Sequence, residues 1–402
     1  MRLFVIVFMV LYLYALAFGI FMTESFRLPA PLLFGFPLIL LFREGGKELV
    51  YSKELIAFSL ALISYYVIGI GDYPSFFATL LNFILCLFFF NYFIGSNTAR
   101  YNLSVFIFFI LLGVSALVLV LNNYFVGVDG LRALLVDDVI LQSPAGISTT
   151  QFTFGYQLAA FTPFLLIYTF LFRKPLFIRL LAFLTCLVLI YLGMQRSVFV
   201  TFAFSISLFL ILAYRFKAVL LITIAVIFSI AFYNLVLKND VNSRDNIVAK
   251  NINNDPEHNR SLLTAENLRI YSEYPLGLVF YGKTWGDVIY RNQVFSSGIT
   301  SHNAYLMFMT YLGPFLSLGF LLFIYGGVFR IAYPALKEIR KRENALLLCL
   351  CFSFIAVSIN ASAHNAWLLS ADGPTLFLYF SILHFDKLKP STELNPALIY
   401  NR

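Results

Sequence analysis

Long apolar runs alternate with short polar connectors along most of the chain. Each run has roughly the 20 consecutive apolar residues that a helix needs to cross a bilayer. None alternates polar and apolar side chains at every second residue, which argues against membrane-spanning strands. The pattern predicts an all-α polytopic membrane protein with about twelve transmembrane helices, near residues 3–22, 28–42, 54–71, 75–95, 103–122, 152–172, 176–193, 197–214, 217–237, 303–329, 344–361 and 366–386.

The first two runs differ from the others. The first follows Arg2 and continues to Met22. It is longer than the apolar core of a signal peptide and no small-residue cleavage site follows it, so we expect it to be retained as a span. The second run is short and contains Pro29, Pro31 and Pro37. These prolines predict a kinked or partly re-entrant helix.

One long polar segment, from Lys238 to Thr300, interrupts the pattern. Within it, Asp255-Pro256 provides an acidic N-cap and a first-turn proline, which predicts a helix from about Glu257 to Glu273, ending before Pro275. The chain is therefore expected to have four parts. These are helices 1–9 in residues 1–237, a large extracytoplasmic loop at 238–300 between helices 9 and 10, helices 10–12 in residues 301–386, and a cytoplasmic tail at 387–402.

The basic residues of the short connectors indicate the orientation. With the N-terminus inside, the outer connectors hold only Arg27, Arg132 and Arg196. Long loops are translocated largely regardless of charge, so the 238–300 loop does not count against this assignment. The bias predicts that both termini are cytoplasmic. The residues placed on the cytoplasmic side are Arg2, Arg43, Lys47, Lys53, Arg100, Arg173, Lys174, Arg179, Arg215, Lys217, Arg330, Lys337, Arg340, Lys341, Arg342, Lys387, Lys389 and Arg402.

Composition supports a membrane protein. The chain is 60% hydrophobic and 12% charged, whereas about a quarter of the residues in a soluble domain are charged. The formal net charge is +8, but the basic residues lie at the ends of apolar runs, which argues against a nucleic-acid partner. The cysteines lie inside apolar runs, which favours buried packing positions over a disulfide framework. They are Cys86, Cys186, Cys349 and Cys351.

Arg196 and His302 are the first candidates for chemistry. Each stands at the predicted outer N-terminus of a helix, where the helix dipole and unpaired N–H groups favour phosphate. Arginine adds bidentate hydrogen bonds to phosphate oxygens, and histidine can accept a proton near neutral pH. The alternatives are an arginine that reaches the membrane interface and a histidine that caps a helix.

Four further residues are candidates. Arg260 belongs to the predicted loop helix and shares a face with Thr264 and Asn267, whereas Arg269 lies about 180° around that helix. The two arginines therefore cannot both face one ligand, and either could be a solvated loop residue. His364 lies on a short outer turn, and Asp372 is an acid inside the last predicted span, where ionisable residues are often functional.

Several kinds of site have no matching motif. The sequence contains no Asp-x-Asp pair, no His-x-x-x-His spacing, no glycine-rich phosphate loop and no serine nucleophile elbow. We therefore expect neither a metal nor a cofactor.

Three motifs, in order, resemble those of the O-antigen ligases and the related Wzy-type O-antigen and capsule polymerases. Gln195-Arg196-Ser197 resembles a short arginine motif at a helix start. Arg260 followed by Pro275-Leu276-Gly277 resembles a loop motif of that family. Ser301-His302-Asn303-Ala304-Tyr305-Leu306, with Tyr311-Leu312-Gly313 and Gly319 after it, resembles a His-Asn-x-x-Leu motif that opens a helix. Gln195, where the family usually has a small hydroxyl residue, and the longer Pro275–Gly282 turn depart from the pattern.

The resemblance implies a metal-independent, inverting glycosyltransferase with a GT-C-like membrane fold in the bacterial inner membrane. Its donor would be a glycan on undecaprenyl diphosphate, and its active site would face the periplasm. Arg196 and Arg260 would bind the diphosphate, Asn303 would contact substrate, and His302 would act on the acceptor hydroxyl. Arg269, His364 and Asp372 are weaker candidates for substrate contact. The implied partners are a glycan or lipid A–core acceptor, a chain-length regulator and a flippase.

Polymerisation of lipid-linked repeat units is the first expectation, because Ser301-His302-Asn303-Ala304-Tyr305 is more similar to the polymerase branch. Ligation of the finished glycan to lipid A–core is the alternative. A transporter of an anionic lipid-linked sugar belongs to another class and would predict inverted repeats or ionisable pairs near the middle of the membrane. A structural partner of an assembly complex would need neither Arg196 nor His302 at a common site.

Overall fold

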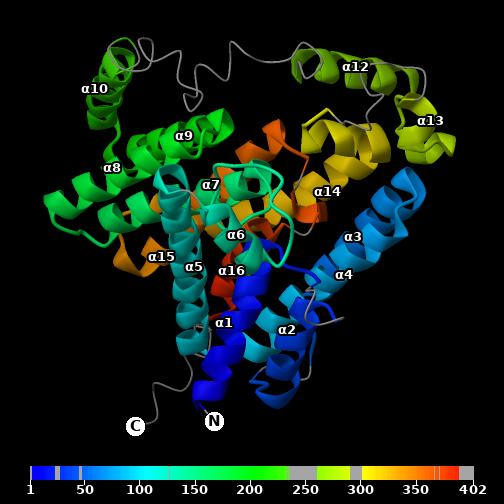
Figure 1. The fold of residues 1–402 in the computed structure, drawn as a ribbon, viewed down its shortest axis with the longest axis horizontal. Helices are drawn as coiled ribbons and strands as arrows, with labels where there is room; N and C mark the ends of the chain where they lie inside the picture. Colours follow the sequence, from blue (N-terminus) through cyan, green and yellow to red (C-terminus); the bar gives the residue numbers. More distant parts are fainter. Residues whose placement is uncertain are drawn as a thin grey trace, which may run out of the picture.

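The computed structural model describes residues 2–22, 28–44, 48–125, 127–232, 234, 260–289, 301–365, 367–370 and 372–388. Within these ranges every regular element is a helix (Figure 1). These helices are long and mostly apolar, as the predicted class requires. The protein is therefore an all-α, multi-pass membrane protein.

A helix lies at each of the twelve apolar runs. Two of them continue into a π-helical turn, η1 (Ile63–Ile70) after α3 and η2 (Phe89–Ile94) after α4. The helices are α1 (Arg2–Phe18), α2 (Ala30–Leu41), α3 (Ser52–Leu62), α4 (Tyr73–Phe88), α5 (Thr98–Tyr124), α7 (Gln151–Leu171), α8 (Leu176–Leu192), α9 (Arg196–Tyr214), α10 (Phe216–Phe232), α14 (Ala304–Lys337), α15 (Ala345–Asn360) and α16 (Gly373–Leu388).

In the described part of the chain, seven helical segments are long and apolar enough to span a bilayer. That the remaining five runs also cross stays a prediction. The seven are Ser52–Ile70, Tyr73–Ile94, Thr98–Tyr124, Gln151–Leu171, Arg196–Tyr214, Ala304–Lys337 and Arg342–Ala363.

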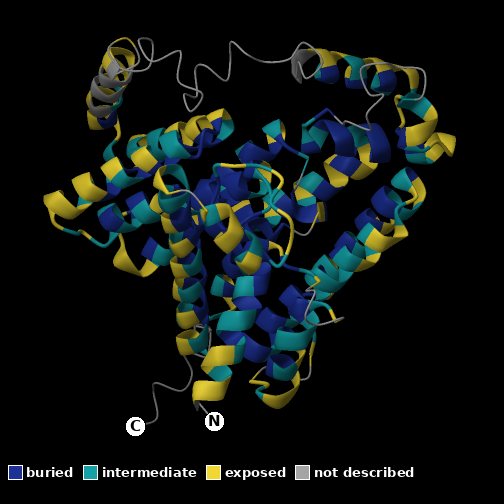
Figure 2. Ribbon diagram, viewed as in Figure 1, coloured by how far each residue is buried: buried dark blue, intermediate teal, exposed yellow. Residues whose placement is uncertain are grey.

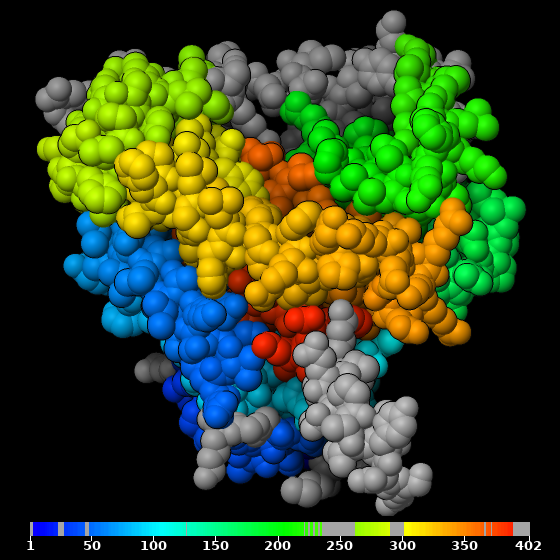
Figure 3. Space-filling model, turned by 180° about the vertical axis from the view of Figure 1, so that it is seen from behind, coloured from blue at the N-terminus to red at the C-terminus, as the bar shows by residue number. Residues whose placement is uncertain are grey.

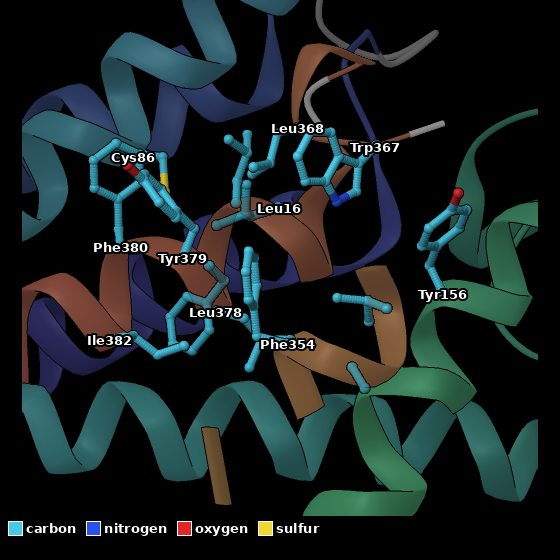
Figure 4. Close-up of a cluster of buried hydrophobic side chains, with 14 of the residues drawn as sticks. Leu16, Cys86, Tyr156, Phe354, Trp367, Leu368, Leu378, Tyr379, Phe380 and Ile382 are labelled. Atoms are coloured by element: carbon cyan, nitrogen blue, oxygen red, sulfur yellow. The ribbon is translucent and has the colours of Figure 1, made fainter. Parts of the chain in front are cut away.

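The interior is built around α16, whose residues from Gly373 to His384 are all buried (Figure 2). Leu16 of α1, Cys86 of α4 and Tyr379 of α16 belong to one apolar cluster (Figure 4). Lipid tails are as apolar as these side chains, so close packing holds such helices together. A Cβ at Gly373 would overlap the carbonyl oxygen of Leu16, so glycine is required where α16 meets α1.

The four cysteines are buried and have free thiols, as their positions in apolar runs predicted.

The helix α14 differs from the single span predicted at residues 303–329. It bends at Gly313, whose φ of 72° is not helical, and the next residue is Pro314, which has no N–H to continue the ladder. The first segment, Ala304 to Leu312, is short. The second segment crosses the back of the molecule towards α15 (Figure 3). Pro314 to Lys337 contains 24 residues and is about 36 Å long, enough to span by itself.

Part of the long polar segment forms a helical unit at the end of the molecule opposite to the start of α1 (Figure 1). It consists of α12 (Arg260–Glu273), the 3₁₀ turn η5 (Leu278–Tyr281) and α13 (Trp285–Ile289). The predicted end of the loop helix at Glu273 is confirmed. Its predicted beginning, from Glu257, lies outside the described residues, as do the tail from residue 389 and most of the predicted loop.

Candidate functional site

Arg196 is the first residue of α9, at the helix end predicted from the sequence, and it is exposed. The preceding Gln195 is buried, and its Nε2 atom donates a hydrogen bond to the carbonyl oxygen of Gln151. A Cβ at Gly155 of α7 would overlap the Gln195 side chain. Gln195, one of the departures from the family pattern, therefore joins the start of α9 to the start of α7.

His302 and Asn303 form the entry to α14. His302 has a φ of 51°, a left-handed conformation in which asparagine, aspartate and histidine are enriched among non-glycine residues. Asn303 is the N-cap, because its Oδ1 atom accepts a hydrogen bond of 3.1 Å from the backbone N–H of Leu306. The imidazole is half-buried, immediately before the helix N-terminus. The Asn303 side chain thus has a capping role that any substrate contact must share.

His364 joins two of these helix starts. Its Nε2 atom lies 3.1 Å from the Oγ atom of Ser197 in the first turn of α9. Its carbonyl oxygen accepts a hydrogen bond of 2.9 Å from the N–H of Ala304, the first residue of α14. Only 4% of His364 is exposed. From its position in the chain, His364 was only a weak candidate for substrate contact, whereas the structure places it between the Arg196 and His302 motifs.

Phe152, in the first turn of α7, completes the connection. Its ring stacks on the His302 ring with centroids 5.9 Å apart, and it packs at a tilt on the His364 ring at 5.2 Å. The N-terminal ends of α7, α9 and α14 therefore meet at one place. Three helix dipoles direct their positive ends to this region, which also contains Arg196 and two imidazoles.

Arg132 holds the segment that leads into α7. It belongs to the short helix α6 (Val128–Val136) and is completely buried. Its guanidinium donates to the carbonyl oxygens of Gly146 and Ser148, at 2.8 and 2.7 Å, and to the carboxylate of Asp129 at 2.7 Å. Further bonds reach Gln142, Ser143 and Asn122. Arg132, which the sequence marked only as an outer basic residue, is therefore a structural clamp.

The hydrogen bonds around Arg132 also change the pKa of Asp129. Its partial burial opposes ionisation, but hydrogen bonds from Arg132, Ser143 and Asn122 outweigh that effect and hold the pKa of Asp129 below its usual value. Burial lowers the pKa of Arg132 from its very high ordinary value, and a guanidinium remains charged at neutral pH.

The loop helix α12 lies along the first segment of α14. Asn267 is fully buried between them: its Nδ2 atom lies 3.1 Å from the sulfur of Met307, and its Oδ1 atom accepts a hydrogen bond from Thr310. Beyond α12, Gly277 contacts Gly313. Asn267 contacts Met307 and Thr310, and Gly277, which comes later in the chain, contacts Gly313, which also comes later. Because the residue numbers increase together on both sides, the two helices run in the same direction. Asn267 thus anchors the polar face identified in the sequence.

This register places the backbone of Arg260. Arg260 precedes Asn267 by seven residues, which is about 10 Å along a helix and nearly two whole turns. Because α12 and α14 run in the same direction, the residue of the α14 segment at the level of Arg260 also lies about 10 Å before Met307 and Thr310. That position is close to His302. The backbone of Arg260 is therefore on the α14-facing side of α12, level with the start of α14; its side chain lies outside the described part.

Arg269 occupies the opposite side of α12, as the helical spacing predicted. Its side chain is 60% exposed and forms ion pairs with Glu266 and Glu273 of the same helix. Nε donates to Glu266 at 2.7 Å and Nη1 to Glu273 at 3.1 Å. The position gives Arg269 no contact with the region around His302.

Asp372 precedes α16 instead of lying inside the helix, which corrects its expected position within a span at 366–386. It is 8% exposed, and its Oδ2 atom accepts a hydrogen bond of 3.2 Å from the backbone N–H of Thr375. This is N-cap geometry. The acid stays buried because it satisfies a helix end.

The structure thus packs His302 and His364 against Phe152, where the starts of α9 and α14, with Arg196 and Asn303, meet. Phe152 and Ser197 were not candidates in the sequence, because an apolar ring and a hydroxyl at helix starts carry no signal of their own. Among the described residues no group of three or more His, Cys, Asp or Glu side chains is placed to hold a metal ion.

No model of a known protein family matches the chain. A comparison with curated proteins also gave no match.

Proposed function

We propose that the protein is a membrane glycosyltransferase that uses a polyprenyl-diphosphate-linked glycan as donor. The observation that supports this best is the meeting of three helix N-termini, Arg196 and His302 around Phe152. Such a place favours a diphosphate, because dipoles and guanidinium both stabilise negative charge. It also brings an imidazole within range of a second reactant.

The proposed reaction follows from these groups. A hydroxyl oxygen of the acceptor attacks the anomeric carbon, and the bond from that carbon to the diphosphate oxygen breaks, which inverts the configuration. The hydroxyl proton passes to the imidazole of His302. Charge increases on the departing diphosphate, where Arg196, Arg260 and the helix N-termini stabilise it without a metal ion.

Polymerisation of undecaprenyl-diphosphate-linked repeat units, for O-antigen, capsule or exopolysaccharide, is the reaction we favour. The basis is the sequence Ser301-His302-Asn303-Ala304-Tyr305. Under this proposal the chain lies in the inner membrane of a bacterium with the site facing the periplasm. Ligation of a finished glycan to lipid A–core uses the same donor chemistry and differs only in the acceptor.

Gel analysis of glycans from a strain that lacks the protein separates the two reactions. Loss of a polymerase leaves lipid A–core that carries a single repeat unit. Loss of a ligase leaves bare core and polymer still attached to undecaprenyl diphosphate. Unchanged glycans of normal length would overturn both assignments. Re-expression of the wild-type chain is the matched control, because it must restore the original ladder.

A transporter of an anionic lipid-linked sugar remains the alternative from another class. Purified protein in vesicles distinguishes it. A transporter moves the lipid-linked donor between leaflets without forming a new glycosidic bond, whereas the proposed enzyme lengthens the glycan and releases undecaprenyl diphosphate.

A further inference from the structure

A basic cavity lies at the C-terminal ends of α7 and α9, at the opposite ends of these helices from Phe152 and Arg196. A cavity of about 280 Å³ between α3 and α14 is lined mainly by apolar side chains, whereas a smaller one, of about 160 Å³, contains three arginines. These are Arg173, Arg179 and Arg340. The helix α7 is 21 residues long, so this cavity is about 30 Å from the Phe152 region. The inference drawn from this cavity does not rest on the proposed function.

Two of the three guanidinium groups are held in place. The Nη2 atom of Arg340 donates a hydrogen bond of 2.8 Å to the carbonyl oxygen of Ala213, near the end of α9. The Arg179 guanidinium lies over the Phe170 ring, 5.3 Å from its centroid. Arg173 occupies a left-handed turn, with a φ of 51°, that joins α7 to α8. The backbone and an aromatic ring therefore orient the charged groups towards one space.

The positive charge has no acidic counterpart there. None of the described residues that line the cavity is aspartate or glutamate. The nearby Glu338 forms an ion pair of 2.7 Å with Lys341 instead. The Nε atom of Arg179 is buried and makes no hydrogen bond within the described part of the chain. Three like charges in a small, partly enclosed space repel one another, and a bound anion relieves that repulsion.

The surroundings indicate the kind of anion. Leu176 and Phe177, at the start of α8, are 69% and 74% exposed, and Phe216, after α9, is 93% exposed. Large apolar side chains beside a basic cavity at helix ends are typical of the boundary between headgroups and acyl chains. The basic-residue pattern predicts that these helix ends face the cytoplasm. At this boundary the apolar side chains lie against lipid, so a phosphate that carries acyl chains can use both the arginines and the apolar side chains.

We propose that this cavity binds the phosphate of an anionic phospholipid. The guanidinium groups of Arg173, Arg179 and Arg340 hold the phosphate, and its acyl chains lie against the exposed apolar side chains of α8 and α10. The lipid fills the space between the ends of α7, α9 and α14 and stabilises their arrangement. Basic cavities between helix ends suit such headgroups because arginine can donate two hydrogen bonds to one phosphate.

The test uses the full chain purified in a neutral detergent. Phosphatidylglycerol and phosphatidylcholine with the same acyl chains are added separately, and the melting temperature and the lipids retained in native mass spectrometry are measured. We expect phosphatidylglycerol to be retained and to raise the melting temperature by about 3 °C. Phosphatidylcholine should do neither. Equal effects of both lipids would overturn the proposal.

Two further arms locate the site and its ligand. The variant Arg179→Gln/Arg340→Gln should lose the response to phosphatidylglycerol, and Arg330→Gln, which removes an exposed charge of α14 outside the cavity, should keep it. Arg173→Asn tests the site without removing a bond to the fold, should the double variant not fold. If Arg173→Asn and the double variant both keep the rise in melting temperature with phosphatidylglycerol, the proposed site is wrong. Glycerol phosphate that protects as well as the lipid would refute the lipid as ligand.

Discussion

Gly277 and Gly313 meet backbone to backbone, and both have positive φ angles, of 94° and 72°. One follows the loop helix α12, and the other is the bend of α14. A Cβ on either residue would overlap backbone atoms of the other segment. The contact fixes the position of α12 along α14 and so the level of the first turn of α12 relative to the start of α14.

Gly277→Ala tests this contact. Gly277 has a φ of 94° and a ψ of 145°, a region that almost only glycine occupies, so the new Cβ costs about 1–3 kcal/mol in backbone strain and also collides with the Gly313 backbone. We expect a lower melting temperature of the purified protein and shortened glycans. The matched control is Gly282→Ala, which has a φ of 61° but open space around its Cβ. If both variants lose the same stability, backbone strain alone explains the effect and the contact is unimportant.

His302→Asn separates chemistry from backbone geometry. Asparagine tolerates the left-handed conformation but cannot take up a proton near neutral pH. We expect loss of long-chain glycan, by at least about 100-fold in turnover, with an unchanged melting temperature. Normal activity in His302→Asn would show that this residue serves only the entry to α14.

Arg260→Ala should abolish long-chain glycan, because the backbone of Arg260 lies on the α14-facing side of α12. Arg269→Ala is the control from the same helix. It removes only exposed ion pairs, which typically contribute about 0–1 kcal/mol, and should keep the wild-type glycan ladder on a gel. Equal loss in the two variants would contradict the assignment of the two faces.

Arg132→Lys should destabilise the protein although the charge is kept. Lysine cannot reproduce hydrogen bonds to Gly146, Ser148 and Asp129 at the same time, so buried carbonyl oxygens lose their partners. We expect a loss of about 2–4 kcal/mol, read from thermal unfolding. Arg269→Lys, at an exposed position, should change little. A wild-type melting temperature in Arg132→Lys would show that the clamp is dispensable.

Asp129→Asn should change the pH dependence of stability. The pKa of Asp129 is lowered in the folded state, so its contribution is present above the unfolded value of about 3.9 and is lost as the pH falls through the folded value. Half of the side chain is exposed, so we expect an effect of at most about 1 kcal/mol. Melting temperatures between pH 7 and pH 3 should fall less steeply in Asp129→Asn than in the wild type.

Part of the site could be predicted from residue positions. Arg196 and His302 each precede an apolar run, which places both at helix starts. The opposition of Arg260 and Arg269 follows from 3.6 residues per turn. The importance of His364 could not be predicted, because its contacts with Ser197 and Ala304 depend on how α9, α14 and the 361–363 turn pack. The prediction that Asp372 lies inside the last helix was wrong, because in an apolar run the sequence of an acid that caps a helix is the same as that of an acid buried within one.

The sequence by itself determined that this chain is helical and crosses a membrane, since runs of about 20 apolar residues have no other stable arrangement in lipid. It also placed Arg196 and His302 at the starts of two helices, α9 and α14. Only the tertiary structure decided that the starts of α7, α9 and α14 meet, that Arg132 is a buried clamp and that α14 bends against Gly277. Those features arise from contacts between segments far apart in the chain, which no local pattern of apolar and polar residues encodes.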